Sequence, residues 1–463
     1  MQKLSRFAAR TFLGLALAST SLLAATWHVD GKGDDTRAGT SPATAFRTLQ
    51  KAADLVAPGD TVLIGDGFYT DPVGTMQSSV LVIARSGRPD AWITWRAAPG
   101  QHPELRPSGW NGILITGSYH VLEGLTITGG NDSIYLQEAI TDAKTDKPNG
   151  RFNTNGIYVN GRLMGPDTKP HHVIIRHCTV RKCGGGGLVG IQTDYFTVED
   201  CQVYENAWFS RYGCSGITTL TNWAFDDAPG YHVVIQRNLV WNNRTLVPWE
   251  KIGKLSDGNS IIMDVTDNEE AAGATNPNAD ATLAAKPAPA AAPVAPPPPA
   301  KAPRPVWRGR TLIANNVSAH NGGSGIHTFR TKHVDIVHNT TYWNGETVGY
   351  AEIFANRSED VNILNNILVP RPAGKVTTNN KNTDVRWDYN LYPVAQTVLT
   401  GPHDLVADPL FVNMAPDPTQ SDLRLRPGSP ALGSATPDLA PPTDATGRPR
   451  PAGALHDRGA FQH

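Results

Sequence analysis

Short β-branched runs recur along the chain, and each is followed by a polar or small residue at an equivalent place. Val173-Ile174-Ile175 and Val233-Val234-Ile235 are two such runs. The basic period is near 23 residues, with longer intervals where loops intervene, and the equivalent residues are Cys178, Cys201, Asn238, Asn316, Asn339 and Asn366. A strand, a turn, a second strand and a second turn in each repeat predict stacked β coils and not helix pairs. Because stacked coils lie about 4.8 Å apart, the Asn amides can hydrogen-bond along the stack and also satisfy their own backbone.

A second set of strands also aligns from repeat to repeat. Its predicted inward-facing ladder is aliphatic: Ile157, Leu188, Ile217, Ile261, Ile326 and Ile353. The period of two in a strand sends the residues between them outward. These outward residues are Tyr158, Val189, Thr218, Ile262, His327 and Phe354, together with Asn160, Ile191, Leu220, Asp264, Phe329 and Asn356. We therefore predict an all-β solenoid, a single-stranded parallel β-helix, and expect a ligand on this outward face.

The segment before the repeats has a different pattern, typical of a helix that caps a solenoid. Phe46, Leu49, Ala53 and Val56 share one helical face. The open end of a solenoid must be covered, and one amphipathic helix across the first coil does this.

The first residues predict export. Lys3, Arg6 and Arg10 form a basic start, and the apolar run Thr11 to Leu23 is too short to span a bilayer and ends at Ala24-Ala25. We therefore expect a signal peptide at 1–25, a secreted or periplasmic protein, and one β-helix domain at 26–463. No later segment predicts a membrane span.

The amino-acid composition limits the classes of molecule that the protein is expected to bind. The 44 Gly and 36 Pro residues indicate many turns, and a formal net charge of −1 is unlike that of a nucleic-acid-binding protein. We expect no nucleic-acid partner and a monomeric protein.

Residues 271–305 are dominated by Ala and Pro and cannot build a core, so we predict a disordered insertion within the one domain. Cys178 and Cys201 occupy the Asn column and predict small inward-facing side chains. Cys183 and Cys214 both lie in turns before the second strand, and the sequence leaves open whether they form a disulfide.

The N-terminal cap, the coils through about Val369 and the closing Arg458-Gly459-Ala460-Phe461 together resemble secreted right-handed parallel β-helix proteins of the pectate-lyase-like superfamily. The resemblance implies a right-handed coil and a carbohydrate substrate, commonly an acidic, uronate-containing polysaccharide cleaved by β-elimination. It does not extend to every motif. The Ca²⁺-binding Asp cluster with a following Lys that marks the best-known pectate lyases is not found in this sequence, and this puts pectate itself in doubt.

Long excursions from the repeat predict where a site lies. The Asn238 to Asn316 interval is far longer than one coil, with extra length from Arg244 to Ser256 and in the Ala/Pro-rich segment; Asn222 to Gly230 is a smaller excursion. We expect all three to converge on one stretch of the outward face. There Asp264 and His327 are expected on neighbouring coils, two residues out of step.

For β-elimination, the resemblance implies a base and a cation that neutralises the uronate carboxylate. We assign the catalytic roles to His327, Lys254 and Arg330. Substrate binding is assigned to Arg357, Tyr158 and Phe329. Carboxylates are the oxygen ligands that Ca²⁺ prefers, and the candidate ligands for a Ca²⁺ ion are Asp264, Asp267 and Asp227.

Two other classes of function stay open. A glycoside hydrolase needs two carboxyls about 5 to 9.5 Å apart, and Asp257 and Asp264 lie seven positions apart, roughly 20 Å if the chain is extended. A hydrolase would therefore pair Asp264 with Asp227, or with Asp257 if the chain folds back; an epimerase is a further alternative. A non-catalytic glycan-binding or structural β-helix would instead use exposed aromatic residues to stack on sugar rings.

Overall fold

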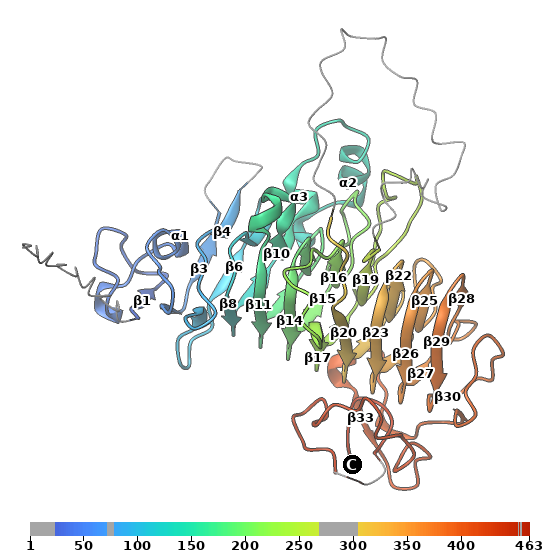
Figure 1. Ribbon diagram of the computed structural model, residues 1–463. Coiled ribbons are helices and arrows are strands. Elements are labelled where there is room, and N and C mark those ends of the chain that lie inside the picture. The colour runs from blue at the N-terminus through green and yellow to red at the C-terminus, as the bar shows by residue number, and fades with distance from the viewer. Residues whose placement is uncertain (1–23, 72–77, 268–303, 452, 454–455) are drawn as a thin grey trace, which may run out of the picture.

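The computed structural model describes residues 24–71, 78–267, 304–451, 453 and 456–463. The predicted signal peptide, except Ala24 and Ala25, and the predicted insertion at 271–305, except Arg304 and Pro305, lie outside the described residues. Within them, the chain winds as a parallel β-helix whose coils stack along one axis from β1 to β30 (Figure 1).

Each full coil contributes one strand to each of three parallel sheets, A, B and C. Over the described residues, sheet A has 11 strands, in this order: β1 (Thr26–Val29), β2 (Thr61–Ile64), β5 (Ile93–Ala97), β8 (His120–Glu123), β11 (His171–Arg176), β14 (Asp194–Glu199), β17 (Tyr231–Gln236), β20 (Arg310–Ala314), β23 (Lys332–Val337), β26 (Glu359–Leu364) and β29 (Thr383–Asp388). Its strands are those that the β-branched runs predict.

Sheet B also has 11 strands in the described part of the chain, most of them three residues long. They are β3 (Phe68–Thr70), β6 (Glu104–Arg106), β9 (Thr126–Thr128), β12 (Thr179–Arg181), β15 (Gln202–Tyr204), β18 (Leu239–Trp241), β21 (Val317–Ala319), β24 (Thr340–Tyr342), β27 (Ile367–Val369), β30 (Leu391–Tyr392) and β31 (Leu405–Val406). The sequence predicted two strands in each coil, whereas the structure has three. The strands of sheet B were missed because each begins directly after the ladder residue and is too short to show a period of two.

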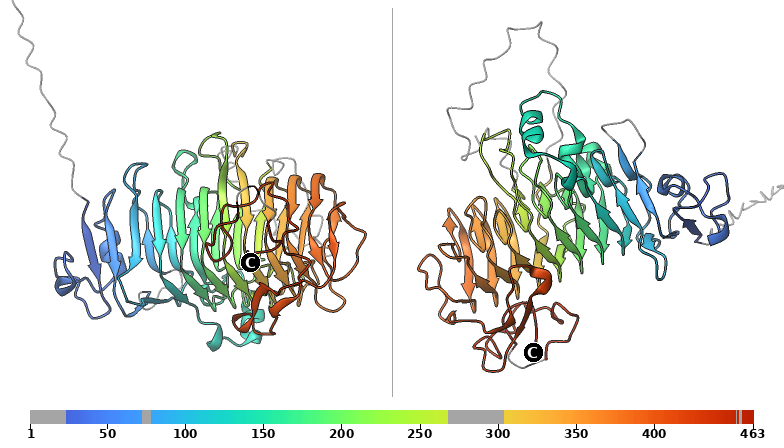
Figure 2. Two further views of the ribbon diagram at one scale, coloured as in Figure 1. Left: turned by 90° about the horizontal axis from the view of Figure 1, so that it is seen from below. Right: turned by 180° about the vertical axis from the view of Figure 1, so that it is seen from behind.

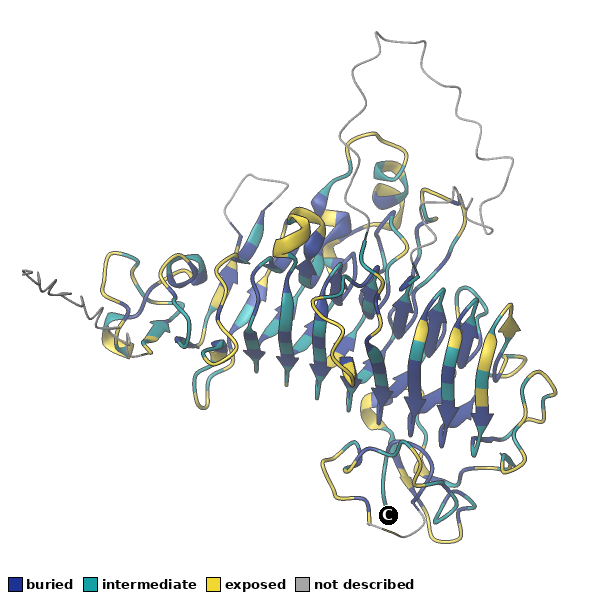
Figure 3. Cartoon of the chain, in the orientation of Figure 1, coloured by how far each residue is buried: buried dark blue, intermediate teal, exposed yellow. Residues whose placement is uncertain are grey.

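Sheet C carries the predicted second strands, nine of them among the described residues. They are β4 (Ser79–Ile83), β7 (Asn111–Ile115), β10 (Asn155–Asn160), β13 (Leu188–Ile191), β16 (Ile217–Leu220), β19 (Ile261–Asp264), β22 (Ile326–Phe329), β25 (Ile353–Asn356) and β28 (Asn379–Asn380). Neighbouring strands pair in the predicted register, from Ile157 opposite Leu188 to Ile326 opposite Ile353. The whole aliphatic ladder is buried (Figure 3).

The predicted Asn column forms a continuous hydrogen-bonded ladder at the corner between sheets A and B. The backbone N–H of Asn316 donates to Oδ1 of Asn339 at 2.9 Å, and that of Asn339 donates to Oδ1 of Asn366 at 2.8 Å. The residue before each ladder Asn, such as His338 with φ 54°, is in the left-handed region, which turns the chain out of sheet A. A second ladder, which the sequence analysis did not identify, joins Asn206, Asn243, Asn321 and Asn344 at the next corner.

A cap helix covers the N-terminal end of the coils, and a C-terminal segment packs along one side. The cap helix α1 (Leu49–Ala53) is shorter than the pattern suggested, but Phe46, Leu49, Ala53 and Val56 are all buried as predicted. The C-terminal segment, with the antiparallel pair β32 (Phe411–Asn413) and β33 (Asp422–Leu425), lies on one side of the last coils (Figures 1 and 2). It packs on sheet B, where the backbone N–H of Ala460 donates to Oγ1 of Thr340 at 3.0 Å.

The four cysteines are free thiols, so no bridge joins Cys183 to Cys214. Cys178, Cys183 and Cys201 are buried, and burial raises the pKa of Cys183 to about 12, which keeps its thiol protonated. The prediction of small inward-facing side chains at Cys178 and Cys201 is confirmed.

Replacing one Asn of the ladder tests how much its hydrogen bonds contribute to stability. Asn339→Ala removes the acceptor of two Asn316 hydrogen bonds and two donations to backbone carbonyls, Ile313 at 2.9 Å and Val337 at 3.1 Å. Because buried polar groups lose their partners, we expect a loss of about 2–3 kcal/mol in the free energy of unfolding by urea. The exposed Asn380→Ala serves as the control and should change it by less than about 0.5 kcal/mol; equal effects of the two variants would contradict the ladder's role.

Candidate functional site

The outward face of sheet C is half-covered and rich in aromatic and polar side chains. Strand pairing places Tyr158, Ile262, His327 and Phe354 in one outward row, as predicted. Tyr158 is partly exposed, whereas Ile262, His327 and Phe354 are buried by neighbouring loops. A ligand on this face would contact aromatic side chains and a few polar groups, with few charged side chains.

Loops border this face at both edges. Segments 129–154, 205–216, 242–260 and 343–352 enter the strands from sheet B, and 161–170 and 221–230 leave them towards sheet A. The first of these carries α2 (Leu136–Asp142) and α3 (Gly150–Asn153), which project from the upper side of the helix in Figure 1. Arg244 to Ser256 and Asn222 to Gly230 therefore border opposite edges of the face.

His327 lies in the middle of β22 with its ring stacked on Phe354, ring centroids 4.1 Å apart. Neither ring nitrogen has a hydrogen-bond partner among the described residues. Burial lowers the pKa of His327 to about 3, so the imidazole is neutral and a weak base at neutral pH.

Arg330 follows β22 and Arg357 follows β25, and both line one cavity of about 140 Å³. Their predicted proximity is thus confirmed. Arg330 is bound in a bidentate ion pair to Asp267, with Nε to Oδ2 at 2.9 Å and Nη2 to Oδ1 at 2.5 Å. Lys332 and Lys381 also line this cavity, against the acidic Asp267 and Glu359. The cavity is thus positively charged, with four cationic side chains and two acidic ones.

The remaining predicted catalytic and binding residues are dispersed. Lys254 is exposed in the loop before β19. Tyr158 is partly buried on β10, where burial raises its pKa. Phe329 ends β22, with its ring centroid 6.4 Å from that of His327. His327 and Phe329 lie on β22 and Arg330 follows it, whereas Tyr158 lies four coils away on β10.

The three predicted calcium ligands are not brought together. Asp264 ends β19, Asp267 binds Arg330, and the exposed Asp227 pairs with Arg308 at 2.9 Å. No group of three or more His, Cys, Asp or Glu side chains that could hold a metal ion occurs in the described ranges. The described carboxylates therefore do not fit a Ca²⁺ site.

Asp257, which the sequence offered only as a possible hydrolase carboxylate, is the titratable group with the raised pKa at the edge of this face. Burial raises the pKa of Asp257 to about 6, although hydrogen bonds from Ser256 and Asn259 oppose the shift. It has φ 63° and lies against Gly213, where an added Cβ would be 2.3 Å from Oδ2 of Asp257. A loop from the preceding coil thus closes over this carboxyl group.

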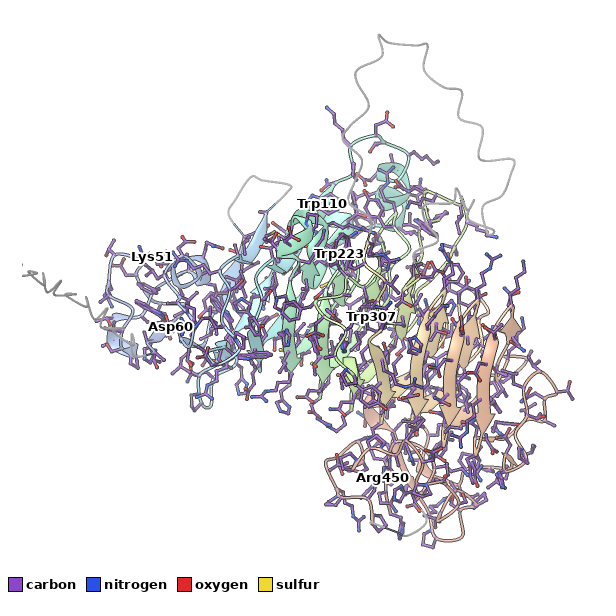
Figure 4. All side chains as sticks on the ribbon, viewed as in Figure 1. Lys51, Asp60, Trp110, Trp223, Trp307 and Arg450 are labelled. Carbon is purple, nitrogen blue, oxygen red and sulfur yellow. The ribbon has the colours of Figure 1, made fainter. Side chains whose placement is uncertain are left out.

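Trp249 and Tyr350 lie near Asp257, and further aromatic side chains follow the same edge of sheet C. A Cβ on the same Gly213 would lie 3.4 Å from the Trp249 ring, and the hydroxyl of Tyr350 lies 3.4 Å from Oγ of Ser256. Burial and the charge of Asp257 raise the pKa of Tyr350, whose ring centroid is 5.9 Å from that of His327. Trp110, labelled in Figure 4, faces Tyr212 at 6.4 Å on the same edge. The arrangement provides one acid–base group beside a row of rings.

Comparison with known proteins agrees with this fold. The model of the family described as a right handed beta helix region matches residues 111–269. Among solved structures, pectate lyase Pel9A aligns over 95% of this chain and 96% of its own, with a TM-score of 0.51 and 16% sequence identity. A rhamnogalacturonan lyase aligns over 84% of this chain and 91% of its own, with a TM-score of 0.45 and 14% identity. The predicted right-handed parallel β-helix fold is confirmed.

One curated relative matches part of the chain. Alpha-1,3-galactosidase A of Akkermansia muciniphila is 27% identical over 140 residues, which is 30% of this chain and 21% of the relative. The chain thus spans about a fifth of that protein. None of the helices in the described part of the chain has the length and apolar character that a membrane span needs.

Asp257 should reduce the stability of the fold at neutral pH. Its folded-state pKa of about 6 lies above the ordinary value of 3.8, so the folded state binds the proton more tightly than the unfolded chain. This contribution to stability is full below about pH 4 and is lost as pH rises through about 6. Asp257→Asn should therefore raise the free energy of unfolding at about pH 7.5 by about 1–2 kcal/mol, and the gain should shrink on acidification.

Urea unfolding of both proteins between about pH 4 and pH 8 measures this difference. The exposed Asp90→Asn is the control and should show no pH-dependent gain. A variant that is destabilised equally at every pH would show that Asp257 is not held in an unfavourable charged state.

Proposed function

We propose that the protein is a carbohydrate-active enzyme, a polysaccharide lyase that binds an acidic, uronate-containing polymer along the outward face of sheet C. The observation that carries the proposal is Asp257, a carboxyl group whose pKa is raised to about 6 beside a row of aromatic side chains. Perturbed pKa values of this kind gather at catalytic sites, because a general base works best with a pKa near the working pH.

The proposed reaction assigns the acid–base roles to the groups at the edge of β19. Above about pH 6, ionised Asp257 takes the proton next to the uronate carboxylate. We assign to the hydroxyl of Tyr350, whose pKa burial and the charge of Asp257 raise, the donation of a proton to the leaving sugar oxygen. This assignment replaces His327 as the base, since a neutral imidazole with a pKa of about 3 accepts a proton poorly.

Two further observations support an acidic polymer. The cavity at the ends of β22 and β25 presents Arg357 and Lys381 beside the Arg330–Asp267 ion pair, and guanidinium groups bind carboxylates in bidentate fashion. Pectate lyase Pel9A, whose fold this chain shares, is named for action on an acidic polysaccharide. No step of this proposal passes through a metal; calcium remains a prediction from the sequence, and a chelated sample in the assay tests it.

Hydrolysis is the second candidate, favoured by the same raised pKa, because a carboxyl group with a pKa of about 6 is also a suitable general acid. Asp264 is a poor second carboxylate, because it ends β19 while Asp257 precedes that strand, and an extended chain keeps them roughly 20 Å apart. The two reactions predict opposite pH profiles. A base must be ionised, so lyase activity rises as pH increases through about 6, whereas activity that needs protonated Asp257 falls over that range.

The assay measures ultraviolet absorbance of unsaturated uronides and new reducing ends, on pectate, alginate, glycosaminoglycans and bacterial exopolysaccharides. We expect absorbance and reducing ends to rise together for at least one polymer, and Asp257→Asn to lower kcat at least about 100-fold. Asp90→Asn should leave kcat unchanged. Reducing ends without absorbance, with activity falling above about pH 6, would establish hydrolysis; no product from any polymer would contradict an enzyme of either class.

A further inference from the structure

A cavity of about 470 Å³ opens at the edge of sheet C opposite to Asp257. Its walls come from segments 161–170 and 221–230, which follow β10 and β16, and from Pro305. Trp223, which lies over the middle coils in Figure 4, lines it with Phe225 and His171. The volume is in the range of sites that hold small molecules or sugar units.

The aromatic lining is exposed but held in place. Phe225 is 48% exposed, yet its ring centroid lies 3.8 Å from that of His171. The backbone N–H of Phe225 donates to Oδ2 of the fully buried Asp194 at 2.9 Å. Asp194 in turn accepts from Nε1 of Trp307 at 2.9 Å and from His232 at 3.0 Å. An exposed ring anchored in this way is preorganised for a partner.

The polar groups of the cavity favour an uncharged ligand. All three donors of the Lys169 ammonium group are used, by Gly161 O at 2.7 Å, Met164 O at 2.9 Å and Gln192 Oε1 at 2.8 Å. That ammonium group also lies 4.5 Å from the centre of the Trp223 ring. Burial and His172 lower the pKa of His171 to about 4, so its ring is neutral. The cavity therefore offers no free cation to an incoming carboxylate.

The apolar and hydrogen-bonding groups that line the cavity suit a sugar ring. The side chains of Phe225 and Trp223, with three proline residues, line the cavity with apolar surface for the C–H face of a pyranose. The exposed carboxylate of Asp167 is an acceptor for sugar hydroxyl groups. We propose that this cavity is a binding site for neutral pyranose units of a glycan, separate from the site at Asp257. The inference goes beyond the proposed cleavage and does not depend on it.

Isothermal titration tests the site with neutral hexasaccharides of xylose, mannose and glucose, and with hexagalacturonate as the acidic probe. We expect at least one neutral probe to bind, and Phe225→Ala to weaken its affinity about tenfold. Phe68→Ala is the matched control, because Phe68 is a 60% exposed ring on β3 away from the cavity. It should leave the affinity unchanged.

Asp167→Ala is a second variant at an exposed position and should also weaken binding, so the test does not depend on the folding of one variant. Asp257→Asn should bind the neutral probe with unchanged affinity, which separates this site from the proposed catalytic one. Absence of binding by every neutral probe, binding by hexagalacturonate alone, or equal affinities of wild type and Phe225→Ala would overturn the proposal.

Discussion

The hydrogen bond from the backbone N–H of each corner Asn to the side-chain carbonyl of the Asn on the next coil is the interaction on which this structure depends. At each corner one residue in the left-handed region bends the chain out of its strand, as Asn365 does with φ 61°. The bend takes the following N–H out of the sheet pairing, and a buried N–H without a partner costs free energy. Asn366 resolves this by donating its N–H to Asn390 and its amide N–H to the carbonyl of Ile336.

The ladder also sets the register, and the register builds the site. Because every corner has the same geometry, Ile262, His327 and Phe354 lie directly beside one another on sheet C. The regular coil carries little chemistry by itself. The candidate acid–base groups lie at corners that carry long loops. Burial by these loops raises the pKa of Asp257 and of Tyr350. A rigid scaffold and irregular corners thus divide stability and function between them.

The features that recur on every coil could be predicted from the sequence alone. The column through Asn316 and Asn339 and the ladder through Ile217 and Ile326 were visible because identical environments select similar residues on every coil. The strands of sheet B and the helices α2 and α3 were not predicted, because three-residue strands have no detectable period and short helices inside a loop depend on tertiary contacts.

The site was predicted only in part, for the same physical reason. The outward position of His327 followed from the period of two, but its low pKa depends on burial by side chains of other coils. The pairing of Arg330 with Asp267 joins residues 63 positions apart. Asp257 reads in sequence as a turn residue, and its raised pKa comes from the approach of Gly213 on a different loop.

The most direct test of cleavage at Asp257 is a crystal structure of Asp257→Asn with a hexasaccharide of the polymer that the wild-type protein cleaves. We expect an intact sugar chain along the outward face of sheet C, with a glycosidic oxygen beside residue 257 and Tyr350. A sugar chain bound to sheet A or sheet B, with the outward face of sheet C empty, would contradict it.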